Sequence, residues 1–355
     1  MAMKKVIGAL RFGCWIVLLG LTACGGGGGG GSESNSSATN TASSSENFFD
    51  EPALFDTSWG IVSTHVDRCD FNTCIDLSKP NTVHFKKDKT GFIRHHGKID
   101  TLTTEQVTAF DYRTRPSFSY PNKSSLVIHD LELNRFSPLA PSSSGSRQIT
   151  YEFSRNGDDT RHLILNSSGT PQEEQTYLTE KTEPFVLPSI DLETIGNYET
   201  SWMIIKKIKA DSSEMEITNT SFPTGEYYTQ DNVLYLQFIS GWSGYPAIKI
   251  LMIPPGGANV HGCFGETQFV TYPNLHQIRF YNNPCQDEVS GDRQVQDIFR
   301  KKLSDLDFQA GTYEISIQND RMELRLIEKY DPITHQPIFG TTYVLRLASW
   351  RKQHN

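Results

Sequence analysis

The chain has 355 residues, with 33 Lys and Arg against 41 Asp and Glu, so its formal net charge at pH 7 is −8. An acidic protein lacks the electrostatic footprint of a nucleic-acid-binding protein, because DNA and RNA are held by Lys and Arg at their phosphates. This charge therefore excludes nucleic-acid binding. The length of the chain suggests two domains.

The first 23 residues have the pattern of an export signal. Lys4, Lys5 and Arg11 form a positively charged start, and residues 12–23 form a short, mostly apolar run. This run has the length of a signal-peptide core and falls short of the ~20 residues that a membrane-spanning helix needs. Without residues 1–23 the chain keeps 30 basic and 41 acidic residues, a net charge of −11.

The end of this segment resembles a known processing site. Leu21-Thr22-Ala23-Cys24 is similar to the lipobox of bacterial lipoproteins, whose cysteine is acylated and becomes the first mature residue. The resemblance implies that acyl chains such as palmitate on Cys24 hold the protein on the membrane, at roughly 0.8 kcal/mol per buried methylene. Gly25 resembles the residue that follows the cysteine in lipoproteins sorted to the outer membrane. Whether the body faces the periplasm or the cell surface stays open.

Residues 24–46 are predicted to form a flexible tether. Seven consecutive glycines, Gly25 to Gly31, are followed by Ser, Asn, Thr and Ala with almost no apolar side chain. Such a segment cannot bury enough apolar surface to fold. As a flexible coil it has a root-mean-square span of roughly 25 Å, which lets the folded body move clear of the lipid headgroups.

Four cysteines remain for disulfide bonds once the signal peptide and the acylation site are set aside: Cys69, Cys74, Cys263 and Cys285. The oxidising cell envelope favours disulfides in an exported chain. Of three pairings we favour the local one, Cys69 with Cys74 and Cys263 with Cys285, which would contribute roughly 2 and 3 kcal/mol. The alternative is a metal site that adds His65 and Asp67 to the first cysteine pair, but this spacing matches no zinc motif.

The folded sequence begins near Phe48 and contains two related halves. Three short segments recur in the same order: residues 56–61 with 199–204, residues 150–154 with 312–316, and residues 176–178 with 342–344. Each half therefore opens on a segment that contains a tryptophan, Trp59 or Trp202. These matches predict a duplicated domain, with a first β-domain at 47–184, a linker at 185–193 and a second β-domain at 194–355.

Alternation of apolar and polar side chains predicts short strands in both halves. Residues 149–154 and 312–317 alternate in this way, and each segment is followed by Asn, Asp or Gly residues that suit a hairpin turn. Further strands are predicted at 83–87, 92–96, 126–133, 163–165, 233–240, 247–253, 267–272, 277–281 and 322–327.

One amphipathic helix is predicted in the second half, with Asp292 as its N-cap. We expect this helix to cover a barrel end or the face of a sheet. Its apolar stripe is formed by Val295, Ile298, Phe299, Leu303 and Leu306.

The tryptophan strands, the alternation and a domain length near 140 residues look like the lipocalin-like barrels of bacterial lipoproteins. The predicted fold class is all-β and mainly antiparallel, with two tandem, related β-barrels or sandwiches and one amphipathic helix in the second. The resemblance implies that each barrel interior is either filled by side chains or able to hold one small apolar ligand.

No sequence motif indicates catalysis. Residues 241–244 lack the Gly-x-Ser-x-Gly spacing of a nucleophile elbow, and residues 254–257 lack the lysine of a phosphate-binding loop. His95 and His96 are adjacent in a predicted strand, so their side chains point to opposite faces. We therefore predict no catalytic residue, no metal, no cofactor and no enzymatic activity.

Three hypotheses about function follow. The first is a non-enzymatic outer-membrane lipoprotein whose β-domains bind a small apolar ligand. The second is a structural lipoprotein that docks on another envelope or surface protein, for example through exposed strand edges. The third, an envelope hydrolase, rests only on unassigned His and carboxylate residues. A hollow barrel interior favours the first hypothesis and a filled interior favours the second.

Overall fold

The structure is a computed structural model of the chain. It describes residues 48–63, 74–99, 102–117, 122–131, 135–136, 149–155, 157, 159–167, 175–219, 232–241, 244–254, 261–263, 267–283 and 293–354. All of these residues belong to one compact unit that spans residues 46–355. The predicted signal, Cys24 and almost all of the predicted tether lie outside the described residues.

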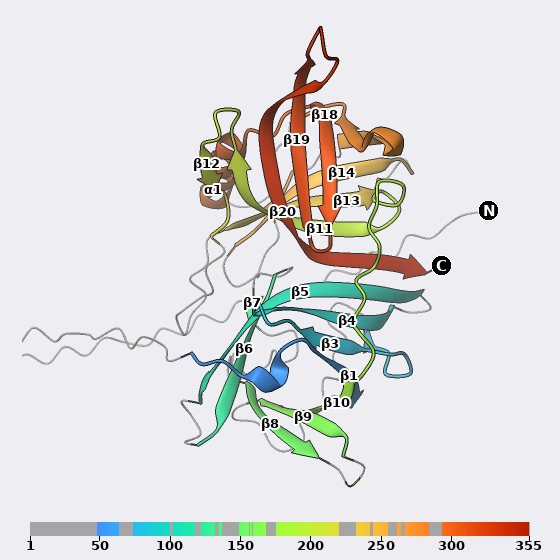
Figure 1. Cartoon of the computed structure of the whole chain (residues 1–355), viewed down its shortest axis with the longest axis vertical. Helices are drawn as coiled ribbons and strands as arrows, with labels where there is room; N and C mark the ends of the chain where they lie inside the picture. The colour runs from blue at the N-terminus through green and yellow to red at the C-terminus, as the bar shows by residue number, and fades with distance from the viewer. Residues whose placement is uncertain are drawn as a thin grey trace, which may run out of the picture. The chain divides into compact units, whose positions relative to one another are not determined.

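The first half of the described chain forms a closed antiparallel β-barrel (Figure 1). Each of its eight strands pairs with the next one, and the last pairs with the first. In order around the barrel they are β1 (Thr57–Ser63), β3 (Thr82–Phe85), β4 (Thr90–Ile99), β5 (Leu102–Pro116), β6 (Ser124–Asp130), β8 (Ile149–Arg155), β9 (Arg161–Ser167) and β10 (Gln175–Lys181).

The second half repeats this topology. Its described residues again give eight strands that pair in chain order and close on themselves. These strands are β11 (Glu199–Ile208), β13 (Val233–Ser240), β14 (Pro246–Ile253), β16 (Thr267–Tyr272), β17 (Gln277–Phe280), β18 (Gly311–Gln318), β19 (Arg321–Tyr330) and β20 (Pro337–His354). The prediction of an all-β chain with two tandem related barrels is confirmed.

Short elements complete the two barrels. β2 (Cys74–Ile75) and β7 (Arg135–Phe136) pair with strands of the first barrel, and β12 (Glu214–Glu216) and β15 (His261–Gly262) pair with strands of the second. Two single-turn 3₁₀ helices, η1 (Pro52–Leu54) and η4 (Pro273–Leu275), and the helix α1 (Arg293–Leu306) are the other described elements.

The two tryptophan strands are equivalent in detail. Trp59 in β1 and Trp202 in β11 are both fully buried, and each indole N–H donates to the hydroxyl of a threonine two residues earlier. The distances are 2.8 Å to Thr57 and 3.1 Å to Thr200. A buried indole needs an acceptor, and the recurring Thr-Ser-Trp sequence provides one within the strand itself.

The second sequence match, residues 150–154 with 312–316, joins equivalent strands of the two barrels. The third match is wrong. Tyr151 in β8 and Tyr313 in β18 are both buried, each in the third strand from the end of its barrel. In contrast, Tyr177 in β10 is 39% exposed, whereas Tyr343 in β20 is 1% exposed. The two residues lie on opposite faces of their strands, because a shift of one residue moves a side chain through the sheet. The match of residues 176–178 with 342–344 is therefore out of register.

The interior of the first barrel is filled by side chains. Phe85 lies at the centre of an aromatic group, with its ring 5.5 Å from Phe110 and 5.0 Å from Tyr112 in edge-on contacts. Residues from all eight strands join one continuous core: Trp59, Val83, Phe85, Ile93, Phe110, Tyr112, Leu126, Ile128, Ile149, Tyr151, Leu163, Leu165 and Leu178.

The interior of the second barrel is filled in the same way. Phe308, which follows α1, stacks on Tyr313 at 5.2 Å and contacts Tyr343 at 4.9 Å. Phe280 adds a third ring, 5.4 Å from Tyr313. Edge-on and offset ring contacts of this kind stabilise a core beyond the area that they bury.

The predicted helix is confirmed as α1, and it packs on the core of the second barrel. Phe299 and Leu306 are fully buried in that core, and Val295, Ile298 and Leu303 pack against it. The apolar stripe thus fixes which side of the helix faces the barrel. The predicted N-cap Asp292 lies outside the described residues.

The two barrels share a hydrogen-bonded sheet. β5 pairs with β6 along its C-terminal half, and residues Thr103 to Thr108 pair instead with residues Ser349 to His354 of β20 (Figure 1). β20 likewise pairs with β19 over its first part and with β5 over its last part. One continuous sheet therefore runs from β4 through β5 and β20 to β11.

The segment between the barrels packs on the sheet and contributes to the core. Phe185 stacks on Phe92 at 5.7 Å and on the His84 ring at 5.4 Å, both from the first barrel. Ile190 and Ile195 are buried in the core of the second barrel. The domain boundaries proposed at residues 184 and 194 stay a prediction.

Candidate functional site

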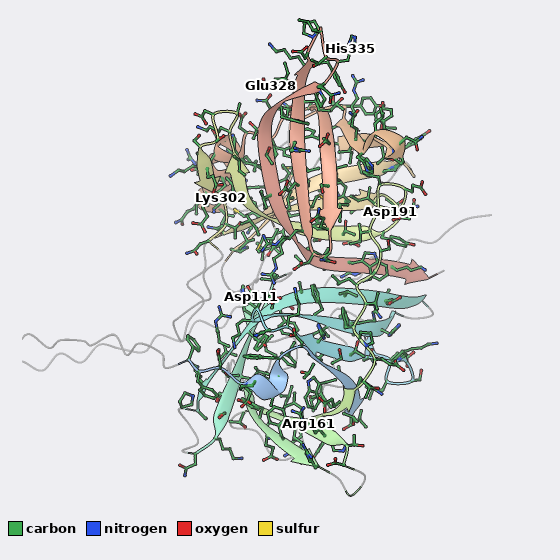
Figure 2. The ribbon with its side chains drawn as sticks, viewed as in Figure 1. Asp111, Arg161, Asp191, Lys302, Glu328 and His335 are labelled. Carbon is green, nitrogen blue, oxygen red and sulfur yellow. The ribbon has the colours of Figure 1, made fainter. Side chains whose placement is uncertain are left out.

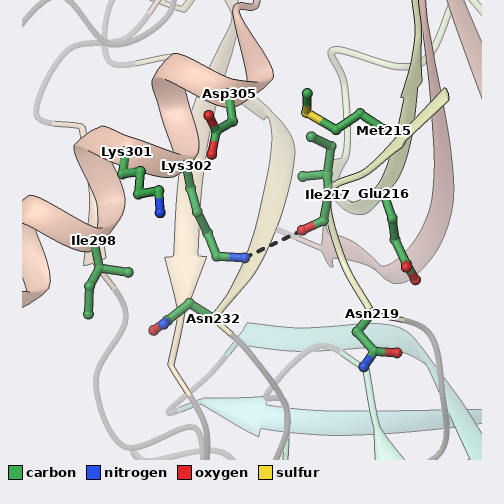
Figure 3. Close-up of a pocket in the computed structure, with 9 residues that line it drawn as sticks. All are labelled: Met215, Glu216, Ile217, Asn219, Asn232, Ile298, Lys301, Lys302 and Asp305. Atoms are coloured by element: carbon green, nitrogen blue, oxygen red, sulfur yellow. Dashed lines mark hydrogen bonds between the residues drawn. The ribbon is translucent and has the colours of Figure 1, made fainter. Parts of the chain in front are cut away.

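A pocket of about 690 Å³ lies beside α1, on the flank of the second barrel (Figure 3). Three segments line it: the end of β12 with the residues that follow, the start of β13, and the middle of α1. The lining residues are Met215, Glu216, Ile217, Asn219, Asn232, Ile298, Lys301, Lys302 and Asp305. A volume of this size falls in the range of small-molecule sites.

The β12 wall is apolar because of strand alternation. Glu216 pairs across the strands with Lys206 of β11, and the neighbouring Glu214 forms a 2.9 Å ion pair with the same lysine. The glutamates therefore share the face away from α1. Met215 and Ile217 take the other face, toward the helix, and Figure 3 shows the Glu216 carboxylate pointing away from the lysines of α1.

The helix wall carries both apolar and charged groups. Ile298 lies one turn before Lys301 and Lys302, and Asp305 lies one turn after Lys301. The Lys302 ammonium reaches across from the helix to the Ile217 carbonyl oxygen, at 3.4 Å (Figure 3). This contact bridges the two walls of the pocket.

The barrel wall holds the C-terminal end of α1 in place. The Tyr343 hydroxyl donates to the carbonyl oxygens of Leu306 at 3.2 Å and Asp307 at 2.7 Å, and burial raises the Tyr343 pKa far above its ordinary value. The buried Lys207 ammonium donates to the Asp305 carbonyl at 3.3 Å. A helix leaves its last carbonyls unpaired, and a cation there is also favoured by the helix dipole.

The hydrolase hypothesis requires a nucleophile beside a base, and the first barrel contains a Ser–His contact. The Ser58 hydroxyl lies 3.0 Å from Nδ1 of His84. Ser58 is only 7% exposed, the His84 ring is stacked under Phe185, and burial lowers the His84 pKa. Ser58 is therefore largely covered in this conformation. The expectation that the protein is not an enzyme stays a prediction.

Arg161 is a residue whose role the sequence did not reveal. Its guanidinium lies 5.5 Å from the Trp59 ring and 5.4 Å from the Phe153 ring, and it forms a 2.9 Å ion pair with Glu180. Barrel closure brings these residues of β1, β8, β9 and β10 together, and no sequence spacing records it. In the second barrel the equivalent positions are the buried Met322 and Leu347.

The predicted disulfide residues are described only in part. Cys263 is buried and disulfide-bonded. Cys69 and Cys285 lie outside the described residues, and Cys74 is described only through its backbone in β2. The pairings of Cys69 with Cys74 and of Cys263 with Cys285 therefore stay predictions, as does acylation of Cys24.

Among the described side chains, no group of three or more His, Cys, Asp or Glu is placed to hold a metal ion. A search of the described helices for one long and apolar enough to cross a membrane also found none. Comparison of the chain with protein-family models, curated proteins and solved structures gave no match.

Proposed function

We propose that this protein is a non-enzymatic outer-membrane lipoprotein that binds a small, largely apolar ligand in the pocket beside α1. The lipobox-like Leu21-Thr22-Ala23-Cys24 and the glycine-rich tether support the lipid anchor. The volume and mixed lining of the pocket support the binding role. The two barrels then act as the framework that positions β12 and α1.

The filled barrel interiors speak against a ligand inside either barrel and, by the criterion of the sequence analysis, favour docking, so the ligand site proposed here lies on the flank of the second barrel. Aromatic rings whose centroids lie 5.0 to 5.5 Å apart belong to the core of each barrel. The described side chains therefore pack the barrel interiors. The observation that carries the proposal is the apolar pair Met215 and Ile217 facing Ile298 across the pocket (Figure 3).

A neutral fluorescent probe tests the binding role. N-phenyl-1-naphthylamine gains fluorescence in an apolar site, and we expect it to bind the mature Cys24→Ala chain with saturation at one site. Ile298→Trp fills the pocket and should remove this signal, whereas Val62→Trp, at an exposed position in β1, should not. Equal binding by both variants would show that the probe binds elsewhere and would refute the proposal.

Metabolic labelling tests the anchor. Radioactive palmitate should mark the wild-type protein, and Cys24→Ala should abolish the label and release the protein from the membrane fraction. A wild-type protein without label, or a variant labelled as strongly as the wild type, would contradict the proposed lipid anchor.

Exposed apolar residues on two hairpins of the second barrel favour docking on another envelope protein as a second candidate. Ile333, at the turn between β19 and β20, is 86% exposed. The Tyr330 hydroxyl accepts from Gln277, which links this hairpin to the β16–β17 hairpin. The exposed apolar residues of the two hairpins are Tyr272, Leu275, Tyr330, Ile333 and Ile338.

These hairpins lie far along β20 from the sheet that joins the two barrels. β20 starts at Pro337 near the hairpin turn, whose outer end is marked by His335 in Figure 2. It first pairs with β5 at Ser349, about 40 Å further along an extended strand. A photo-crosslinker at Ile333 should capture one envelope protein in cells, and one at Val62 should not; no adduct at Ile333 would dismiss this candidate.

A further inference from the structure

We infer that the ligand of the pocket beside α1 is an amphipathic anion, with an aliphatic chain and one carboxylate or phosphate-like headgroup. This inference rests on the proposed binding function and specifies its ligand. It depends on the charges and apolar groups that the pocket brings together, and each of these comes from a described residue.

Two lysines and two acidic residues supply the charged side chains of the described lining. Lys301 and Lys302 both belong to the helix wall, and Figure 3 shows their ammonium groups between Ile298 and Ile217. Of the two acidic lining residues, Glu216 shares the face of β12 that bears Glu214 and meets Lys206. Asp305 is then the one acidic side chain on the helix wall, against two lysines.

The Lys302 ammonium is well placed to bind an anionic headgroup. It is half-buried, and its 3.4 Å contact with the Ile217 carbonyl is long for a hydrogen bond. An anionic oxygen forms shorter and stronger hydrogen bonds with an ammonium than a neutral carbonyl does. An ammonium has three N–H donors, so a headgroup between the two walls can accept from Lys302 beside its existing contacts, and Lys301 lies on the same wall (Figure 3).

The apolar lining suits an aliphatic chain. Met215 and Ile217 lie on one side of the lysines and Ile298 on the other (Figure 3). A methionine adapts its shape to a flexible chain, because it is unbranched and polarisable. The amide groups of Asn219 and Asn232 complete the lining and can bond further headgroup oxygens.

Three twelve-carbon probes distinguish this ligand class from others. Dodecanoate, dodecanol and dodecyltrimethylammonium share one chain and differ in the charge of the headgroup. Each displaces N-phenyl-1-naphthylamine from the mature Cys24→Ala chain, below its own micelle concentration. We expect dodecanoate to bind about tenfold more tightly than dodecanol, and the cation to bind most weakly.

Matched lysine variants assign the effect to the pocket. Lys302→Met keeps the length of the side chain without its charge, and should weaken dodecanoate about tenfold while changing dodecanol less than twofold. Lys209→Met, at an exposed position just after β11, should change neither probe. Lys301→Met is the second variant, used if Lys302→Met alters the circular dichroism spectrum.

Each outcome bears on one statement. If dodecanol or the cation binds as tightly as dodecanoate, the inferred anion is wrong and the proposed binding function stands. If no probe displaces the naphthylamine and the naphthylamine itself does not bind, the proposed function is wrong. A phosphate-headed probe, dodecyl phosphate, separates phosphate from carboxylate ligands, and weak binding of both anions would also overturn the inference.

Discussion

His95 shows how the joined sheet changes the chemistry of a single residue. It pairs with Gln106 in β5, and Gln106 pairs in turn with Arg351 of β20. Burial, with the nearby charges of Arg351 and His96, lowers the His95 pKa to about 4 from 6.5. The imidazole is therefore neutral in the folded protein at pH values where the unfolded chain is already protonated.

Folding stability should fall as the pH drops below 6.5, because the unfolded chain then binds a proton at His95 that the folded protein does not bind. The stability that neutral His95 contributes is complete above pH 6.5 and is lost between pH 6.5 and about 4, by at most about 3 kcal/mol. Urea unfolding at pH 7, 5 and 4 should show a smaller loss for His95→Gln than for the wild type. The exposed His335→Gln is the control, and equal losses in all three proteins would contradict the assignment.

At the scale of elements, α1 depends on the barrel wall for its C-terminal end. Tyr343 lies on β20 inside the barrel, and its hydroxyl bonds two carbonyls at the end of the helix. The amphipathic stripe was readable from residues 293–306, because helical periodicity is local. The partner of the helix end was not readable, because it comes from a strand nearly 40 residues later and depends on the register of β20.

Tyr343→Phe should destabilise the protein by about 1–3 kcal/mol, because it removes the hydroxyl donor from the buried Leu306 carbonyl and from the partly buried Asp307 carbonyl. Tyr330→Phe removes a hydroxyl that accepts from Gln277 at an exposed site, and should cost less than about 0.5 kcal/mol. Urea denaturation followed by circular dichroism measures both values. Similar losses in the two variants would mean that the Tyr343 hydroxyl does not hold the helix end.

β5 is an element that the alternation pattern missed. Val107 and Ala109 face the core of the second barrel, while Phe110 faces the interior of the first. A strand buried on both faces loses the apolar–polar alternation that marks a strand with one wet face. β13 and β16, in contrast, begin and end where the sequence predicts.

At the scale of the molecule, a buried ion group spans the two barrels. Arg346 of β20 lies 2.8 Å from the Asp111 carboxylate of β5, in the first barrel, and 3.6 Å from the Asp320 carboxylate. All three side chains are largely buried, and Figure 2 labels Asp111 at the level of β5. The Tyr235 hydroxyl adds a buried bond to the Leu131 carbonyl of the first barrel.

We expect the two barrels to unfold together, and Arg346→Met to weaken that coupling. The variant leaves two buried carboxylates without their cation, which costs about 3–5 kcal/mol. Arg155→Met, which removes an exposed ion pair with Asp159, should cost at most about 1 kcal/mol. Urea unfolding monitored by tryptophan fluorescence and circular dichroism should give coincident transitions for the wild type; separate transitions in the wild type would contradict a shared unfolding unit.

The sequence by itself determined the all-β class, the duplication of the tryptophan strand, most strand positions and the single helix. These features depend on periodicity over a few neighbouring residues, which the chain records directly. The tertiary structure alone decided the opposite faces of Tyr177 and Tyr343, the contact of Arg161 with Trp59, the sheet shared by β5 and β20, and the pocket beside α1. Each of these depends on register and closure between strands far apart in the chain, and a shift of one residue would place every side chain on the other face.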